Sequence, residues 1–354
     1  MRGAALLRLC SVAIAVLAGC AGSPVATPAP PSMQDPTSAA TDRRADCVLV
    51  DSDAGLDDLR AIAVLAPHRR IAAVVATEGL ATPRGGARAL RAYLRGTGIP
   101  VVEGASPPPG RGPDPHRVRG LDGPRITAET LNGTLPAADP ASQAGEAPAP
   151  SLEAEVERLT AGCERLDLLM IGPWTSFLRY DRAVVARLAR VVAQGSPFPD
   201  DEARGQPDGW NCRYDYSACR EAFARLGRRD LRADWVDIPQ GARTCGSAEP
   251  GKDAAGRRVY SFTPDAEMAW AFAATPDELP RNLGRLMLHN PVGLERTSLW
   301  DDLAALYLLR PDIFGRVRDP SGRSGGHFEP CVPAQQVRDM LVAASAGPPS
   351  NLGR

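Results

Sequence analysis

The chain has 354 residues, 44% of them hydrophobic, which is enough for one large or two ordinary domains with a substantial core. Its 41 Lys and Arg residues nearly balance its 42 Asp and Glu residues, so the formal net charge is −1. This balance argues against a nucleic-acid partner, because binding through bulk electrostatic attraction needs an excess of positive charge.

The N-terminal 19 residues have the composition of a targeting segment. Arg2 and Arg8 supply positive charge, and residues 9–17 form an apolar stretch too short to span a bilayer. The letters LAGC that end at Cys20 resemble a bacterial lipobox, where cleavage leaves a lipidated N-terminal cysteine. The alternative is an ordinary secretory signal with a cysteine there by chance. We expect residues 1–19 to be a lipoprotein signal peptide. Lipid at Cys20 would then anchor the protein in the bacterial cell envelope, facing the periplasm or the exterior.

Composition divides the rest of the chain into one folded domain and two flanking segments. Residues 20–45 are rich in Ala, Pro, Ser and Thr and are expected to form a flexible linker. Residues 46–346 are expected to form a single domain, and residues 347–354 a disordered tail. Residues 106–150 are rich in Pro, Gly and Ala, which predicts long surface loops of the kind that often lie over a ligand site.

Cysteine usage is consistent with an oxidising compartment. Beyond Cys20 and the cysteine of the signal segment, six cysteines remain, an even number that predicts disulfides but leaves many pairings open. Cys47 and Cys163 each precede an apolar run of strand type, so we predict that these two pair. No CxxC pair occurs, which argues against a thiolate metal site.

Apolar runs of strand type alternate with segments of helical spacing. The first run, Cys47–Val50, ends at Asp51, and apolar residues at helical spacing follow a turn at Gly55. Further strands are expected at 71–75, 100–102, 166–171, 190–193 and 235–238, and further helices at 87–94 and 152–159. This alternation predicts an α/β fold with one open, mostly parallel, Rossmann-like sheet and helices on both faces.

Four aspartates cluster at the end of the first predicted strand: Asp51, Asp53, Asp57 and Asp58. In parallel α/β sheets, ligands bind at the carboxyl ends of the strands. Four carboxylates at one such point repel one another unless protons or a cation intervene, and capping of the following helix explains only one or two of them. A hard divalent cation is the natural compensation, and Ca²⁺ tolerates the irregular geometry of a turn.

Two other chemistries share this type of motif. An EF-hand loop counted from Asp51 needs an acidic ligand at its twelfth position, which Ile62 occupies. A haloacid-dehalogenase-type phosphatase generally uses a lysine from a later strand-to-helix segment, but the single lysine, Lys252, lies in a polar, Gly-rich stretch. Neither alternative fits the rest of the chain.

The sequence VLVDSDAGLDDLRAIAVLA (48–66) resembles DTDPGxDDxxAI, the opening motif of the inosine-uridine nucleoside hydrolase family. Further blocks follow in the order of that family, namely IPVVEGA (99–105), LDLLMIGPWTSFLR (166–179), WNCRYDYSAC (210–219) and LWDDLAALYLL (299–309). The resemblance covers about residues 47–310, and it implies the nucleoside hydrolase fold for a divergent, lipoprotein-type member.

The resemblance also implies a ligand set for Ca²⁺. Asp53 would be both a calcium ligand and the general base that activates a calcium-bound water. Asp58 would bind the ion through both oxygens, Thr175 would offer its backbone carbonyl, and Asp301 would complete the set. Asp51 would support the cluster from just outside it.

Substrate contacts follow from the same resemblance. Asp57 and Asn211 would hold the ribose, and His116 fits a degenerate loop block of the family, although a lone loop histidine is more often simply solvated. Trp300 stands where the late block usually has His, as in some purine-preferring relatives. Its indole is expected to stack on a purine base, the alternative being a packing role in the core.

Four further departures concern the sugar pocket and the late block. Leu80 replaces a sugar-binding Asn, Gly209 replaces a Glu, and Gln194 stands at a position where the family favours Met. Asp302 replaces the usual Pro and is expected to cap a helix. These changes predict an intact calcium site beside an eroded ribose shell.

The resulting hypothesis is Ca²⁺-dependent hydrolysis of the N-glycosidic bond of ribonucleosides to free base and ribose, with a purine preference as one implication. The expected partners are a nucleoside or related riboside and the membrane, through Cys20; homo-oligomerisation is left open by the sequence. One alternative is a catalytically impaired, calcium-dependent nucleoside- or sugar-binding lipoprotein. Another is an enzyme acting on a non-nucleoside glycoside.

Overall fold

The computed structural model describes residues 46–108, 151–195, 209–239, 262–290, 297–317 and 326–347, with the backbone alone of two short strands, β7 (Gly251–Lys252) and β8 (Arg258–Val259). The predicted signal peptide, the anchor at Cys20, the linker, the residues after 347 and His116 lie outside this part of the chain. No helix among the described residues is long and apolar enough to cross a bilayer.

An eight-stranded sheet forms the centre of the molecule, in the order β3-β2-β1-β4-β5-β6-β10-β9. All neighbouring strands are parallel except β9 and β10, so the predicted open, mostly parallel sheet is confirmed. The strands are β1 (Asp46–Ser52), β2 (Arg70–Ala76), β3 (Val101–Glu103), β4 (Arg165–Met170), β5 (Leu188–Gln194), β6 (Ala233–Val236), β9 (Phe314–Arg316) and β10 (His327–Pro330).

Side chains of the central strand β1 alternate between two separate cores. Cys47 and Leu49 face one core, whereas Val48 and Val50 face the other, and all four are completely buried. Because both faces are covered, the strand is an unbroken apolar run, as expected for a parallel sheet between two helical layers. The first polar side chain after this run is Asp51, at the carboxyl end of the strand.

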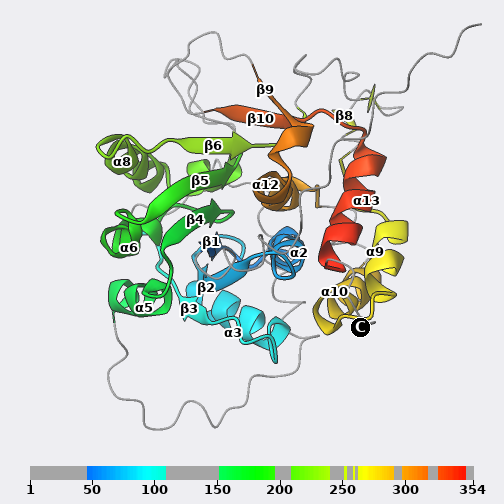
Figure 1. Ribbon diagram of the computed structural model, residues 1–354, viewed down its shortest axis with the longest axis horizontal. Helices are drawn as coiled ribbons and strands as arrows, with labels where there is room; N and C mark the ends of the chain where they lie inside the picture. Colours follow the sequence, from blue (N-terminus) through cyan, green and yellow to red (C-terminus); the bar gives the residue numbers. More distant parts are fainter. Residues whose placement is uncertain are drawn as a thin grey trace, which may run out of the picture.

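Helices cover both faces of the sheet (Figure 1). One layer is made of α5 (Leu152–Thr160), α6 (Phe177–Val184) and α8 (Tyr216–Gly227), which follows the short α7 (Trp210–Tyr214). The other is made of α2 (Leu56–Leu65), α3 (Pro83–Tyr93), α9 (Ala266–Ala273), α10 (Glu278–His289), α12 (Trp300–Leu309) and α13 (Ala334–Ser345). A 3-10 turn, η3 (Pro311–Ile313), joins α12 to β9.

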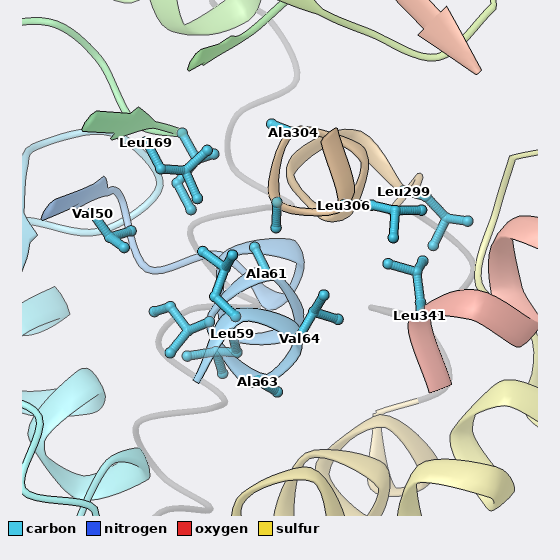
Figure 2. Packing of buried hydrophobic residues seen from close by; sticks show 14 of the residues in the cluster. Val50, Leu59, Ala61, Ala63, Val64, Leu169, Leu299, Ala304, Leu306 and Leu341 are labelled. Carbon is cyan, nitrogen blue, oxygen red and sulfur yellow. The ribbon is translucent and has the colours of Figure 1, made fainter. Parts of the chain in front are cut away.

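The helix that follows β1 is enclosed on every side. All ten residues of α2 are buried. Figure 2 shows its apolar side chains between Val50 and Leu169 of the sheet and Leu306 and Leu341 of α12 and α13. A helix in this position cannot place a charged side chain in solvent, so any charge on it must find a partner inside the protein.

The chain reverses direction beside β1. It passes from β1 to β2 and β3 on one side, and then returns to β4, β5 and β6 on the other. Such a reversal opens a crevice outside the carboxyl ends of the two central strands, here β1 and β4, which is where ligands bind in open α/β sheets.

Two disulfides fix segments on the α5–α6–α8 side of the sheet. Cys47 at the start of β1 is bonded to Cys163 before β4, which confirms the predicted pair. Cys212 and Cys219 form a second disulfide between α7 and α8, a pairing that the sequence left open.

The two disulfides should differ in their contribution to stability. They span separations of 116 and 7 residues, and the loop-entropy relation assigns about 5 kcal/mol to the long loop and about 2 kcal/mol to the short one. Urea denaturation of Cys47→Ser/Cys163→Ser and of Cys212→Ser/Cys219→Ser, each against the native protein, measures both losses. Equal losses would contradict this prediction.

Candidate active site

The turn between β1 and α2 folds around the carboxylate of Asp58. This side chain accepts one hydrogen bond from the backbone N–H of Asp53 at 3.2 Å and another from that of Gly55 at 2.9 Å. Asp58 lies in the first turn of α2, where unpaired N–H groups and the positive end of the helix favour a negative charge. The local sequence therefore places two further acids, Asp53 and Asp57, beside it in a fixed turn.

A distant helix supplies one more acid to this cluster. Asp301 lies in the first turn of α12. One carboxylate oxygen each from Asp57, Asp58 and Asp301 lie within 4.8 Å of one another, and all three residues are buried. Among the described residues this is the one group arranged to hold a metal ion. The structure thus brings the predicted ligands Asp58 and Asp301 together, and it adds Asp57, which the sequence assigned to the sugar.

Asp53 lies against the loop that follows β2. Its Oδ2 accepts a hydrogen bond from the backbone N–H of Leu80 at 3.2 Å. A Cβ atom on Gly79 would lie 2.3 Å from the same oxygen, so only glycine allows the loop to approach this closely. Leu80, which lacks the amide side chain typical of the family, still serves Asp53 through its backbone.

Burial and mutual repulsion dominate the electrostatics of the cluster. Burial raises the pKa of Asp53 and of Asp301 well above the ordinary value, and neighbouring carboxylates raise both further. The pKa of Asp57 is raised to about 7, first by burial and then by the charge of Asp58. Carboxylates in this state retain protons unless a cation replaces them.

The donor set suits a hard divalent cation. Its members Asp57, Asp58 and Asp301 offer carboxylate oxygens from the first turns of two helices, with no sulfur or imidazole, and the predicted ligand Asp53 is not one of the three. Oxygen ligands of this kind are preferred by Ca²⁺ and Mg²⁺, and the irregular turn favours the more tolerant Ca²⁺. The residues present therefore fit the metal that the sequence predicts.

Two further buried acids, Asp51 and Asp215, accept hydrogen bonds from hydroxyl groups. Asp51 is completely buried, and its Oδ2 accepts a hydrogen bond from the hydroxyl of Tyr180 at 2.7 Å. Thr175, in the segment after β4, donates its hydroxyl to Asp215 at 2.8 Å. Asp215 in turn caps α8 by accepting from the N–H of Ala218, so the backbone at Thr175 is held in place.

Asn211 on α7 keeps one buried acceptor free. Its Nδ2 donates to the backbone carbonyl of Ile171 at 2.9 Å and to Oε1 of Gln194 at 3.0 Å. Its Oδ1 is buried without a hydrogen-bond partner. An unpaired buried amide oxygen is costly, which points to a ligand that donates to it.

Two residues that the sequence did not single out stand near these groups. The hydroxyl of Tyr214, which follows Asn211 on α7, donates to Oε1 of Glu78 at 2.9 Å. Glu78 directly precedes Gly79 and Leu80, where the sugar-binding Asn of the family is missing. The signal available in the sequence was the carboxylate of Glu78, which stands two residues before Leu80, where the polar side chain of the family is missing.

The expectation for Asp302 was incomplete. Asp302 lies in the first turn of α12, but both its oxygens accept from the guanidinium of Arg60, with Nε and Nη2 each at 2.8 Å. Its position is therefore explained by an ion pair with α2 as well as by the start of its own helix. Sequence patterns did not predict this pair, because Arg60 lies in the apolar motif of α2.

Trp300 is the first residue of α12 and directly precedes Asp301. It is half-buried and packs against the core on the α2 side of the sheet. Trp300 therefore has the packing role that was the alternative interpretation. Part of its ring is still exposed, and stacking of this part on a base stays a prediction.

Comparison with known proteins agrees with the geometry. Residues 48–340 match the family model described as inosine-uridine preferring nucleoside hydrolase. The chain belongs to this family. Membership implies a metal-dependent hydrolase that acts on nucleosides. No match was found among curated proteins.

Solved structures share the fold. The inosine-uridine preferring nucleoside hydrolase of Bacillus anthracis is 16% identical, with a TM-score of 0.57 over 85% of this chain and 99% of that one. The inosine-guanosine nucleoside hydrolase is 14% identical, with a TM-score of 0.55 over 86% and 99%. The type III effector XopQ, solved with adenosine diphosphate ribose, is 17% identical, with a TM-score of 0.57 over 88% and 99%. At these identities the likeness establishes the fold.

The stability of the nucleoside hydrolase domain should depend on pH in a way that calcium changes. Because the pKa of Asp57 rises from 3.8 to about 7 on folding, the folded state holds more protons between these values, and its stability falls as pH rises through about 7. In chelator, the melting temperature should therefore fall between pH 5 and pH 8, and calcium should reduce the fall. Asp57→Asn should reduce it as well; an unchanged fall in this variant would contradict the assignment.

Proposed function

We propose that this protein is a calcium-dependent nucleoside hydrolase that cleaves the N-glycosidic bond of ribonucleosides to free base and ribose. The observation that carries the proposal is the meeting of Asp57, Asp58 and Asp301 at the starts of α2 and α12, with Asp53 near enough to raise the pKa of Asp301. Family membership supplies the reaction class, and these residues supply a site for it.

Asp53 is the proposed general base. When bound, calcium would supply Lewis acidity that lowers the pKa of a coordinated water. The N–H of Leu80 holds one oxygen of Asp53, which orients the carboxylate to take a proton. The negative charge of the cluster favours the oxocarbenium-like transition state of glycoside cleavage.

The ribose is proposed to bind between Asp57 and α7. The free Oδ1 of Asn211 accepts a hydrogen bond from a sugar hydroxyl, and Asp57, in the first turn of α2, offers a second acceptor. Fixing the ring in this way reduces the entropy cost of reaching the transition state. The leaving base is proposed to stack on Trp300, with His116 as a further contact, and a purine suits the indole best.

Location and partners complete the proposal. Lipid at Cys20 would anchor the domain in the cell envelope, where it would scavenge nucleosides at the periplasmic or outer face. The soluble domain would carry out the chemistry, and association with a second copy of the chain is compatible with it.

A binding-only lipoprotein is the second candidate, and the loss of polar side chains at Leu80 and Gly209 motivates it. Each lost sugar hydrogen bond removes roughly 0.5–1.5 kcal/mol of binding energy. Chromatography of a nucleoside panel separates the candidates, because the enzyme releases base and ribose, whereas a binding protein retains intact nucleoside. Release of sugar from other glycosides alone would favour a non-nucleoside substrate.

Asp53→Ala should abolish turnover without unfolding the domain. Loss of a general base is expected to lower kcat by about 10²–10⁴-fold. Nucleoside hydrolysis is measured at saturating calcium, with circular dichroism to verify the fold, and chelation of the native enzyme should likewise stop the reaction. Asp167→Asn, which changes an acid on β4 outside the cluster, is the matched control. Full turnover by Asp53→Ala would refute the mechanism.

Asn211→Ala tests the sugar contact separately from the metal. Removing the free Oδ1 should lower kcat/KM by about 10-fold, consistent with one lost hydrogen bond. Calcium affinity, measured by titration calorimetry, should stay unchanged because Asn211 contacts Ile171 and Gln194 rather than the acidic cluster. A parallel loss of calcium affinity would show that Asn211 acts on the cluster instead.

A further inference from the structure

We infer that the buried ion pair between Arg60 and Asp302 positions the metal-binding carboxylates, by locking the first turn of α12 against α2 before any cation arrives. The inference rests on the calcium site of the proposed function. It assigns Arg60 and Asp302 as positioning residues, since neither belongs to the group of carboxylates that could hold the ion.

The pair has the geometry of a rigid connection. The guanidinium of Arg60 donates through Nε to Oδ1 of Asp302 and through Nη2 to Oδ2, both at 2.8 Å. Nη2 also donates to the backbone carbonyl of Ser298 at 2.8 Å, and Nη1 reaches the hydroxyl of Thr297 at 3.3 Å. One side chain of α2 therefore holds both the first turn of α12 and the segment that leads into it.

The ion pair lies next to the metal-binding carboxylates along both helices. Asp302 directly follows Asp301, and Arg60 follows Asp58 by two residues, so the connection lies one step behind the contact between metal-binding carboxylates. Ionised Asp57 and Asp58 repel an ionised Asp301 across the same two helices, and in the metal-free protein a hydrogen bond between Asp58 and Asp301 relieves this repulsion. When the carboxylates give up their protons to bind a cation, the ion pair keeps α12 against α2.

Stability alone does not account for the pair. Both side chains are 0% exposed, and apolar residues of similar size often replace a buried ion pair without loss of stability. The pair is a cation beside an anion, and the two charges act on the pKa of Asp57 in opposite directions, Arg60 lowering it and Asp302 raising it. The two directional hydrogen bonds of the ion pair fix the geometry between α2 and the start of α12, which an apolar contact would not do.

The test removes the pair while keeping its net charge at zero. In Arg60→Met/Asp302→Leu, calcium affinity measured by titration calorimetry should fall at least tenfold, while circular dichroism and the melting temperature in chelator show an intact fold. The control is Arg69→Met/Asp167→Leu, which removes another ion pair of 2.8 Å, partly exposed, that joins the turn before β2 to β4 away from the site. The control should bind calcium as the native protein does.

A calcium affinity within twofold of native in an intact Arg60→Met/Asp302→Leu variant would overturn the inference while leaving the proposed function standing. Failure of the native protein to bind calcium would instead refute the metal site itself, and the inference with it.

Hydrogen exchange of the native protein gives a readout that needs no variant to fold. The amide of Leu303, which donates to the carbonyl of Leu299 and closes the first turn of α12, should be protected in chelator as strongly as with calcium, because the ion pair orders this turn in the metal-free protein. Protection of this turn that rises more than tenfold on adding calcium would show that the cation, not Arg60, positions Asp301, and would overturn the inference.

Discussion

Repulsion among buried carboxylates is the constraint on which the rest of this structure depends. Acids after the end of β1 and at the starts of α2 and α12 are buried close to one another, and burial raises their pKa values. The protein offsets the surrounding charges individually, with Tyr180 donating to Asp51 and Arg60 to Asp302. The remaining negative charge is concentrated where α2 meets α12, which is why a divalent cation suits this point and no other in the described chain.

Local patterns were sufficient to predict the sheet and the acidic turn. The alternation of Cys47–Val50 between two cores is visible as an unbroken apolar run, and the spacing of the four aspartates follows from one strand end and one helix start. The Cys47–Cys163 pair was also predictable, since both cysteines precede neighbouring strands. Asp301 was predicted as a metal ligand only from the family resemblance, because no pattern in its own segment indicates contact with residues so distant in the chain.

Contacts between distant elements were not predictable. Arg60 lies in a helix that is buried on all sides. The spacing of apolar residues predicts that this helix is enclosed, but it does not predict that Arg60 pairs with Asp302. The same holds for Asn211, whose free oxygen depends on Gln194 accepting its amide N–H across the crevice. Sequence patterns define the face of an element, whereas these contacts depend on which side chain stands opposite, and only the packed structure supplies that.

The uneven change across the site favours the proposed hydrolase over a protein that has lost the activity. Keeping Asp53, Asp57, Asp58 and Asp301 buried together opposes folding at neutral pH unless a cation is bound, so a protein without a use for the metal would gain stability by losing them. The sugar side keeps Asn211, the residue that the family resemblance assigns to the ribose, although Leu80 and Gly209 lack the polar side chains of the family. Gln194 accepts the Asn211 amide N–H, and the Oδ1 of Asn211 has no partner among the described residues. A chain that keeps both a costly metal site and an unpaired acceptor for a sugar hydroxyl fits the proposed catalysis better than the alternative of binding alone.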